Sequence, residues 1–179
     1  SLPYKEPNQL VHVWETNPQR QFSEREASYP DYLDWKEQNQ VFEDVAAFTR
    51  WRPVLTTGGE PERILAEQVS ASLFSVLRVE AAAGRTFLHE EDRPGRAFVP
   101  EDDKPEAITV AIISHGLWKR RFGSDNELVG KTITLNGNPY TVVGVMSNDF
   151  RHPAPDALTD HELFSLVFEP GKGQAIQHC

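Results

Sequence analysis

One histidine and three carboxylates stand side by side in His89-Glu90-Glu91-Asp92. Such side chains bind metals, but a specific site needs ligands held on a fixed face, usually with more than one histidine or cysteine. These four residues fall in a polar run, and the sequence offers no second cluster of ligands to meet them. A solvated acidic loop is the favoured interpretation, and Glu101, Asp102 and Asp103 are interpreted in the same way.

Two other arrangements resemble catalytic groups. Ser114-His115-Gly116 puts a serine beside a histidine, but neighbours at a helix start project in different directions. The sequence also lacks the Gly-x-Ser-x-Gly elbow of many hydrolases, so Ser114 is better explained as a helix cap. Asp31 and Asp34 are interpreted as a helix N-terminal charge and a hydrogen-bonding partner. Because Gly58-Gly59 is followed by Glu-Pro-Glu, there is no phosphate-binding loop. We therefore expect no enzyme, no cofactor and no metal.

Trp51 stands apart from the aromatic residues assigned to the core, because Arg50 and Arg52 flank it. Two interpretations stay open: an exposed strand edge that contacts a partner, or a structural tryptophan stacked on its neighbours. With the acidic residues it completes a set of candidate partner-contact positions. These are Trp51, His89, Glu90, Glu91, Asp92, Glu101, Asp102 and Asp103.

The composition is that of a folded acidic domain. The 179 residues are 39% hydrophobic, enough for the core of one domain or two small ones. Against 27 acidic side chains stand 18 basic ones, a formal net charge of −9 that argues against nucleic acid as a partner. The basic run Lys119-Arg120-Arg121 is interpreted as a solvated helix face. Cys179 is the single cysteine, and no apolar run reaches the length of a membrane span, so we expect this piece to be soluble by itself.

Strands and helices alternate in the first half of the chain. Residues 10–15 predict a strand and residues 16–27 a loop. A helix is expected from Pro30, after the cap Ser28, and apolar residues at three- to four-residue spacing continue it to Phe48, with a break near residues 38–40. Residues 54–57, a turn at 58–61 and residues 63–71 predict a hairpin.

The second half carries stronger local patterns. A short helix over residues 73–77, capped by Ser70 or Ser72, precedes a turn at Gly84, and residues 89–106 are expected to form a long mobile loop. Residues 108–113 predict a strand buried on both faces, followed by a helix that ends at Gly123. Residues 131–146 predict a hairpin with a type I′ turn at Asn136-Gly137. A last strand is expected at 163–168 and an unstructured tail at 171–179.

Several of these pieces, in this order, resemble the extracytoplasmic core domain of MacB-type (FtsX-like) ABC transporter permeases. The resemblance extends over residues 2–168. Members of that family usually continue with an Arg-Leu-Lys-Pro-Gly-like run, which this sequence does not contain. The matching pieces are a strand at 11–15, Tyr29-Pro30-Asp31-Tyr32, the turn Gly59-Glu60-Pro61-Glu62-Arg63, the turn Gly84-Arg85-Thr86-Phe87, residues 113–118 and Leu135-Asn136-Gly137.

The resemblance implies an α+β fold over residues 1–170. A porter-like α/β lobe would comprise residues 1–60 and 147–170, and a smaller, mainly-β (sabre-like) lobe residues 61–146. It also implies a place on the periplasmic or extracytoplasmic face of the bacterial inner membrane, next to transmembrane helices of the same polypeptide.

A non-catalytic function is implied as well: coupling of cytoplasmic ATP hydrolysis, by a separate ATP-binding subunit, to export or mechanotransmission. The outer partner would be a substrate, a periplasmic adaptor, a lipoprotein or a second permease, and not nucleic acid. The alternative is a free-standing envelope module that binds a peptide or a glycan.

Overall fold

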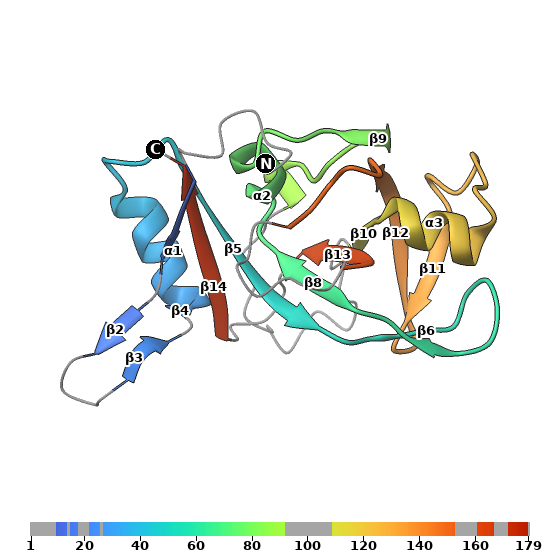
Figure 1. The fold of residues 1–179 in the computed structure, drawn as a ribbon, viewed down its shortest axis with the longest axis horizontal. Helices are drawn as coiled ribbons and strands as arrows, with labels where there is room; N and C mark the ends of the chain where they lie inside the picture. Colours follow the sequence, from blue (N-terminus) through green and yellow to red (C-terminus); the bar gives the residue numbers. More distant parts are fainter. Residues whose placement is uncertain are drawn as a thin grey trace, which may run out of the picture.

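The structure, a computed structural model, describes residues 10–13, 15–17, 22–25, 27–91, 109–152, 161–166 and 172–178. These residues form an α+β fold, as the sequence predicts, in which α1 and α3 lie toward opposite ends of a long mixed sheet (Figure 1). The helices are α1 (Tyr29–Gln38), α2 (Leu73–Val76), α3 (His115–Phe122) and the 3-10 helix η3 (His89–Glu91). The strands are β1 (Leu10–Val13), β2 (Glu15–Asn17), β3 (Phe22–Arg25), β4 (Ala27–Ser28), β5 (Asp44–Trp51), β6 (Val54–Leu55), β7 (Glu62–Arg63), β8 (Ala66–Val69), β9 (Ala81–Gly84), β10 (Val110–Ile113), β11 (Thr132–Leu135), β12 (Asn138–Met146), β13 (Leu163–Leu166) and β14 (Lys172–His178).

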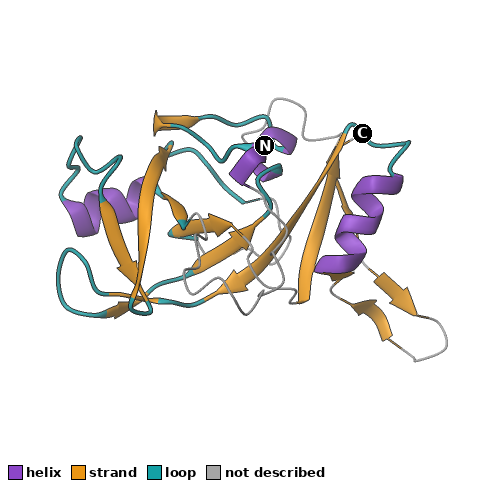
Figure 2. Ribbon diagram, turned by 180° about the vertical axis from the view of Figure 1, so that it is seen from behind, coloured by secondary structure: helices purple, strands orange, loops and turns teal. Residues whose placement is uncertain are grey.

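The main sheet has the order β1-β14-β5-β8-β13-β10-β12-β11-β6-β7, with β4 beside β14 and β9 beside β12. Two neighbouring pairs are parallel, β8 with β13 and β10 with β12, and the other described pairs are antiparallel. β2 and β3 form a separate two-stranded ribbon at the α1 end of the molecule (Figures 1 and 2). Within the described residues no helix has the length and hydropathy that a membrane crossing requires.

The middle of the sheet is buried on both faces, because successive side chains of a strand point to opposite sides. In β10, Val110 and Ile112 belong to one hydrophobic cluster, while Ala111 and Ile113 belong to another. Helix α2 covers the first cluster with Phe74 among its apolar side chains, and α3 covers the second. The prediction of a strand buried on both faces is confirmed for β10.

The second half of the predicted first helix is wrong. α1 ends at Gln38, where the Asn39 carboxamide accepts from the backbone N–H groups of Val41 and Phe42, and β5 follows. Residues 45–48 are all buried, because α1 packs on one face of β5 and the cluster under α2 on the other. A short apolar run that is buried on both sides fits the spacing of a helix as well as that of a strand. Spacing alone therefore predicted the wrong element for these residues.

Two further predictions fail at segments whose strands are defined by backbone pairing rather than by an apolar pattern. The tail expected to be unstructured contains β14, which pairs with β1 on one side and β5 on the other. The segment 16–27, expected to be a loop, contributes to β2, β3 and β4. Backbone hydrogen bonds to a neighbouring strand stabilise a strand without demanding an apolar sequence, so such strands leave a weak pattern.

Three local predictions are confirmed. The Ser114 hydroxyl accepts from the backbone N–H of Leu117 and caps α3, which ends at Gly123. β11 and β12 form the expected hairpin, and φ is +49° at Asn136 and +80° at Gly137, as a type I′ turn requires. The last predicted strand is β13.

Neither serine before α2 caps that helix with its side chain. Ser70 Oγ instead accepts from the backbone N–H of Ala47 at 2.9 Å, and Ser72 Oγ donates to the carbonyl of Val45 at 2.8 Å. The Tyr32 hydroxyl lies 3.4 Å from Ser72 Oγ. These bonds tie the start of α2 and the face of α1 to the same stretch of β5.

Gly84 and Gly144 let two strands approach more closely than other residues would allow. They are direct partners in the β9–β12 pair. A Cβ atom on Gly84 would lie 2.2 Å from the carbonyl oxygen of Val143, and one on Gly144 would lie 2.2 Å from that of Arg85. The Gly-Arg-Thr-Phe turn thus owes its glycine to this approach as well as to a φ of +71°.

Candidate functional site

Trp51 is partly buried at the end of β5, where it packs against the cluster beneath α3. Its ring centroid lies 5.9 Å from that of Tyr140, with the rings tilted by 45°. Its ring therefore packs within the domain, and contact of its exposed part with a partner stays a prediction.

The candidate contacts at the start of the acidic loop occupy η3, and only two of the three are exposed. His89 and Glu90 face solvent, while Glu91 is buried and its carboxylate binds the Arg85 guanidinium through both oxygens, at 2.6 and 2.9 Å. The Leu88 backbone N–H also donates to Glu91 at 2.8 Å. Burial opposes the charge on Glu91, but these hydrogen bonds outweigh it and hold the pKa of the carboxyl below its usual value. Glu91 therefore anchors the segment that presents His89 and Glu90.

A pocket of about 430 Å³ lies beside η3, between α2 and the segment after Gly84. Apolar groups such as Phe74 and Phe87 line it together with Arg78, Glu80 and the exposed His89. The remaining candidates, Asp92, Glu101, Asp102 and Asp103, lie outside the described residues, as does most of the loop expected at 89–106.

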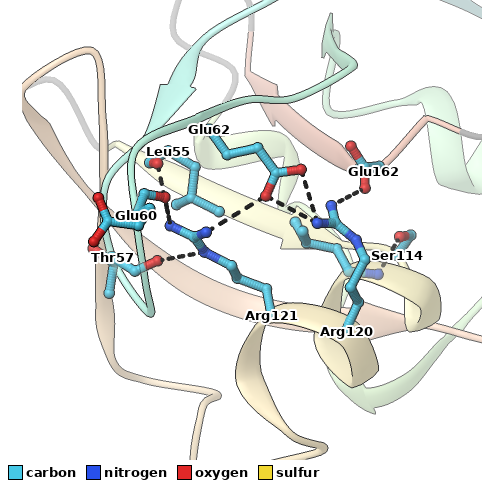
Figure 3. Close-up of polar contacts among 9 residues, drawn as sticks. Leu55, Thr57, Glu60, Glu62, Ser114, Arg120, Arg121 and Glu162 are labelled. Carbon is cyan, nitrogen blue, oxygen red and sulfur yellow. Dashed lines mark hydrogen bonds and ion pairs between the residues drawn. The ribbon is translucent and has the colours of Figure 1, made fainter.

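Two residues of the basic run on α3, Arg120 and Arg121, make contacts with other elements (Figure 3), whereas Lys119 is exposed as expected. Arg120 binds Glu62 of β7 at 2.8 and 2.9 Å and also binds Glu162, just before β13. Hydrogen bonds from Arg120 hold the pKa of Glu62 below its usual value, and Glu62 and Glu162 in turn raise the pKa of Arg120.

Arg121 reaches from the same helix into the turn between β6 and β7. It donates to the carbonyls of Thr57, Leu55 and Glu60, and its side chain is only 10% exposed. Backbone carbonyls and carboxylates thus surround the two arginines, as Figure 3 shows, so this network holds three elements together. The role of this network is therefore structural.

In the described part of the chain, one group of potential metal ligands lies together that was not singled out from the sequence. Glu67 of β8, His152 and His161 have side chains that are 1%, 2% and 4% exposed. His152 Nε2 lies 3.0 Å from Glu67 Oε2, and His161 Nε2 lies 3.4 Å from Glu67 Oε1. Potential ligand atoms of the three residues all lie within 4.8 Å of one another.

Three separate stretches of chain bring this cluster together. In the sheet, Glu67 stands opposite Phe164 of β13 and Arg50 of β5. His152 follows β12 by six residues, and His161 precedes β13 by two. A carboxylate in the strand Ala66–Val69 and a histidine on each side of a proline-containing connection were the available signals. Neither matches a local metal-binding spacing, because the fold creates the proximity.

The sequence-based exclusion of a serine–histidine catalytic pair agrees with the geometry. Ser114 Oγ is occupied by the cap of α3, and His115 packs edge-on against Trp118, with ring centroids 5.5 Å apart. Asp34 is exposed on α1.

Comparisons with known proteins identify the fold and the family. One solved structure similar to this one is the periplasmic region of MacB from Actinobacillus actinomycetemcomitans, with 15% identity and a TM-score of 0.63, over 94% of this chain and 73% of that one. Another is the extracellular domain of the noncanonic ABC-type transporter YknZ from Gram-positive bacteria, with 16% identity and a TM-score of 0.59, over 94% and 81%. A search of curated protein sequences gives no match. The family model of the MacB-like periplasmic core domain matches residues 2–168, and the chain therefore belongs to that family.

Proposed function

We propose that this domain is the extracytoplasmic part of a MacB/FtsX-type ABC permease that carries ATP-driven movement from membrane helices to an outer partner or substrate. In this proposal the domain makes and breaks no covalent bonds, and the energy comes from a cytoplasmic ATP-binding subunit. Family membership supports the setting, since the family is defined by MacB-like periplasmic core domains.

The observation that carries the proposal is the pairing of β1 with β14. These strands, near the two ends of the chain, are antiparallel neighbours, and Leu10 stands opposite His178. The start of β1 and the end of β14 therefore lie at the same end of this strand pair. A domain inserted between two membrane helices needs this arrangement, because both connections must reach one membrane surface.

Stiffness along the molecule is the second requirement. Starting from β1 and β14, an unbroken series of hydrogen-bonded strands reaches β6 and β7 at the other end. There the arginines of α3 bind Glu62 and Glu162 and so connect the far hairpin to the start of β13. A displacement applied at β14 is passed on by backbone hydrogen bonds and not by a flexible linker. The division into two lobes, at about residues 60 and 147, stays a prediction.

The outer contact surface is proposed to include the exposed His89 and Glu90 with the following segment, in which Asp92, Glu101, Asp102 and Asp103 lie. Glu91 anchors this surface through Arg85 rather than meeting a partner. The neighbouring pocket, lined by Phe74 and Phe87, also suits the alternative of an envelope module that binds a peptide or glycan, because apolar and charged side chains line it together.

Mechanical transmission is tested by making the connections at the two ends of the domain flexible. In the permease that contains this domain, flexible Gly/Ser segments of equal length are inserted before Leu10 and after His178, and ATP hydrolysis and transport are measured in proteoliposomes. We expect hydrolysis to persist while transport falls to background, because a random coil does not transmit displacement. Stiff helical insertions of the same length serve as the matched control. Transport by the slack variant equal to that of the unaltered protein would refute mechanical transmission.

A second experiment tests the contact surface. Replacing residues 92–108 by a short Gly/Ser linker leaves the described sheet intact, so we expect unchanged folding but impaired transport or partner binding. Unchanged transport rejects the assignment of this segment. The binding-module alternative predicts a different result. The isolated domain would bind a peptide or glycan without any membrane helices, and the linker variant would lose that binding.

A further inference from the structure

The buried cluster of Glu67, His152 and His161 has the donor set and the spacing of a metal site. Both imidazoles present Nε2 to the same carboxylate, and each faces a different oxygen of it, at 3.0 and 3.4 Å. Two ligand atoms on a tetrahedral zinc ion with bonds of about 2.0–2.2 Å stand roughly 3.3–3.6 Å apart. The two nitrogen–oxygen separations lie near this range, and the potential ligand atoms of all three residues lie within 4.8 Å of one another, so small side-chain rotations would bring them to one ion.

The positions of the side chains are held from several directions. The ring of His152 packs edge-on against Phe48 of β5, with centroids 4.6 Å apart, and against His161, with centroids 5.6 Å apart. Glu67 is fixed in a central strand, paired on both sides. Because the backbone and neighbouring rings fix the donors, little freedom is lost when an ion binds, which favours binding.

The chemistry of the three donors limits which metal ions could bind. Two imidazole nitrogens and one carboxylate oxygen suit zinc and its first-row neighbours, whereas calcium and magnesium need six or more oxygen ligands or several waters. Burial also matters, since an exposed acidic cluster would bind cations without selectivity.

We propose that Glu67, His152 and His161 bind one divalent transition-metal ion of the zinc class. The ion would pin both ends of the connection between His152 and His161 to β8 at the centre of the sheet. Three protein donors leave one position of a tetrahedral ion to water. Because all three donors are buried, we assign the site a structural role, in which the ion closes a loop and favours the folded state, where its ligands meet. It does not depend on the transport role proposed above. Without a metal, the same residues would form a hydrogen-bonded Glu–His–His cluster, and this is the competing outcome.

Metal titration of the 179-residue chain distinguishes the two. The protein is stripped with a chelator, its single thiol is removed by Cys179→Ser, and zinc, cobalt(II) and calcium are titrated by calorimetry. We expect one zinc per chain, a raised melting temperature, an intense visible band with cobalt(II) typical of tetrahedral coordination, and no heat with calcium. Glu67→Gln and His161→Ala should each weaken zinc at least about tenfold. His89→Ala and His115→Ala, which remove histidines outside the cluster, should keep full affinity.

If the variants of the cluster do not fold, the proposal can still be tested on the chain that keeps all its histidines. In imidazole nitrogen NMR spectra, the Nε2 resonances of His152 and His161 should shift on addition of one equivalent of zinc, while those of His89 and His115 should not. Absence of stoichiometric zinc binding, equal affinity in folded Glu67→Gln protein, or shifts confined to other histidines would each overturn the proposal.

Discussion

Adding one methyl group at Gly84 should lower the free energy of unfolding far more than adding one at Gly137, although both glycines have positive φ. In Gly84→Ala the new Cβ would lie 2.2 Å from the carbonyl oxygen of Val143 and 3.0 Å from Cα of Gly144. At Gly137 nothing lies within 4 Å of the corresponding position. The pair therefore separates backbone strain from steric overlap in the same protein.

The magnitudes follow from these two terms. A left-handed conformation costs an L residue roughly 1–2 kcal/mol, which is the whole expected effect of Gly137→Ala. Forcing extra atoms into a packed region costs about 1–3 kcal/mol, and the upper half applies at Gly84 because the obstructing atom is backbone and no rotamer relieves it. We expect Gly84→Ala to lower the free energy of unfolding by about 3–5 kcal/mol. Gly144→Ala, which adds overlap with Arg85 without the positive φ, should cost about 2–3 kcal/mol.

Urea unfolding followed by tryptophan fluorescence and by circular dichroism measures these differences, provided that the m-value stays constant across the series. Gly116→Ala, on α3 with only Ser114 Oγ within 4 Å, controls for the substitution itself and should be neutral or stabilising. The reasoning is refuted if Gly84→Ala and Gly137→Ala destabilise equally, since the close strand approach would then carry no energetic weight.

Three other outcomes are expected. Arg121→Ala, which leaves the carbonyls of the β6–β7 turn without their charged donor, should lower the free energy of unfolding by about 1–3 kcal/mol in urea; no change would show that water replaces the guanidinium fully. Ser114→Ala should cost about 1 kcal/mol through loss of the α3 cap, and Ser114→Asp should restore most of it. The lowered pKa of Glu91 adds stability that is present above the ordinary carboxyl pKa and is lost as pH falls through the folded-state value. Below about pH 4 the unaltered protein should therefore lose more stability than Glu91→Gln, as measured by unfolding at several pH values, and parallel pH profiles would contradict the Arg85–Glu91 assignment.

Helices and turns that are determined by a few neighbouring residues could be predicted from the sequence. The α3 helix has its cap at Ser114 and its stop at Gly123, and the β11–β12 turn has the two residues that tolerate positive φ. In these cases the local chemistry and the final environment favour the same structure, so tertiary contacts had nothing to override.

Elements defined by distant partners could not be predicted. β5 has an apolar spacing that also fits a helix, and its strand conformation follows from pairing with β8 and β14. β14 has few apolar residues and depends on backbone hydrogen bonds to strands more than a hundred residues away. No window of the sequence contains that information.

The site was predictable only in part, for the same reason. His89 and Glu90 are exposed beside a pocket, as a contact surface needs, but the capture of Glu91 by Arg85 depends on how the turn after Gly84 folds back. His152 and His161 are 85 or more residues from Glu67 in the chain. The parallel pairing of β8 with β13 brings His161 close to Glu67, and His152 reaches it from the segment after β12, packed on Phe48 of β5.

The register of β1 against β14 also decides how the domain would yield under load. Leu10 and His178 are paired at the outer end of this ladder, so a force that draws the two chain ends apart opens one hydrogen-bonded pair at a time, like a zipper. A force that moves both ends in the same direction leaves that ladder unopened and shifts the sheet as a unit. The sheet is therefore easily opened by separation of Leu10 from His178 and resists deformation when the two move together.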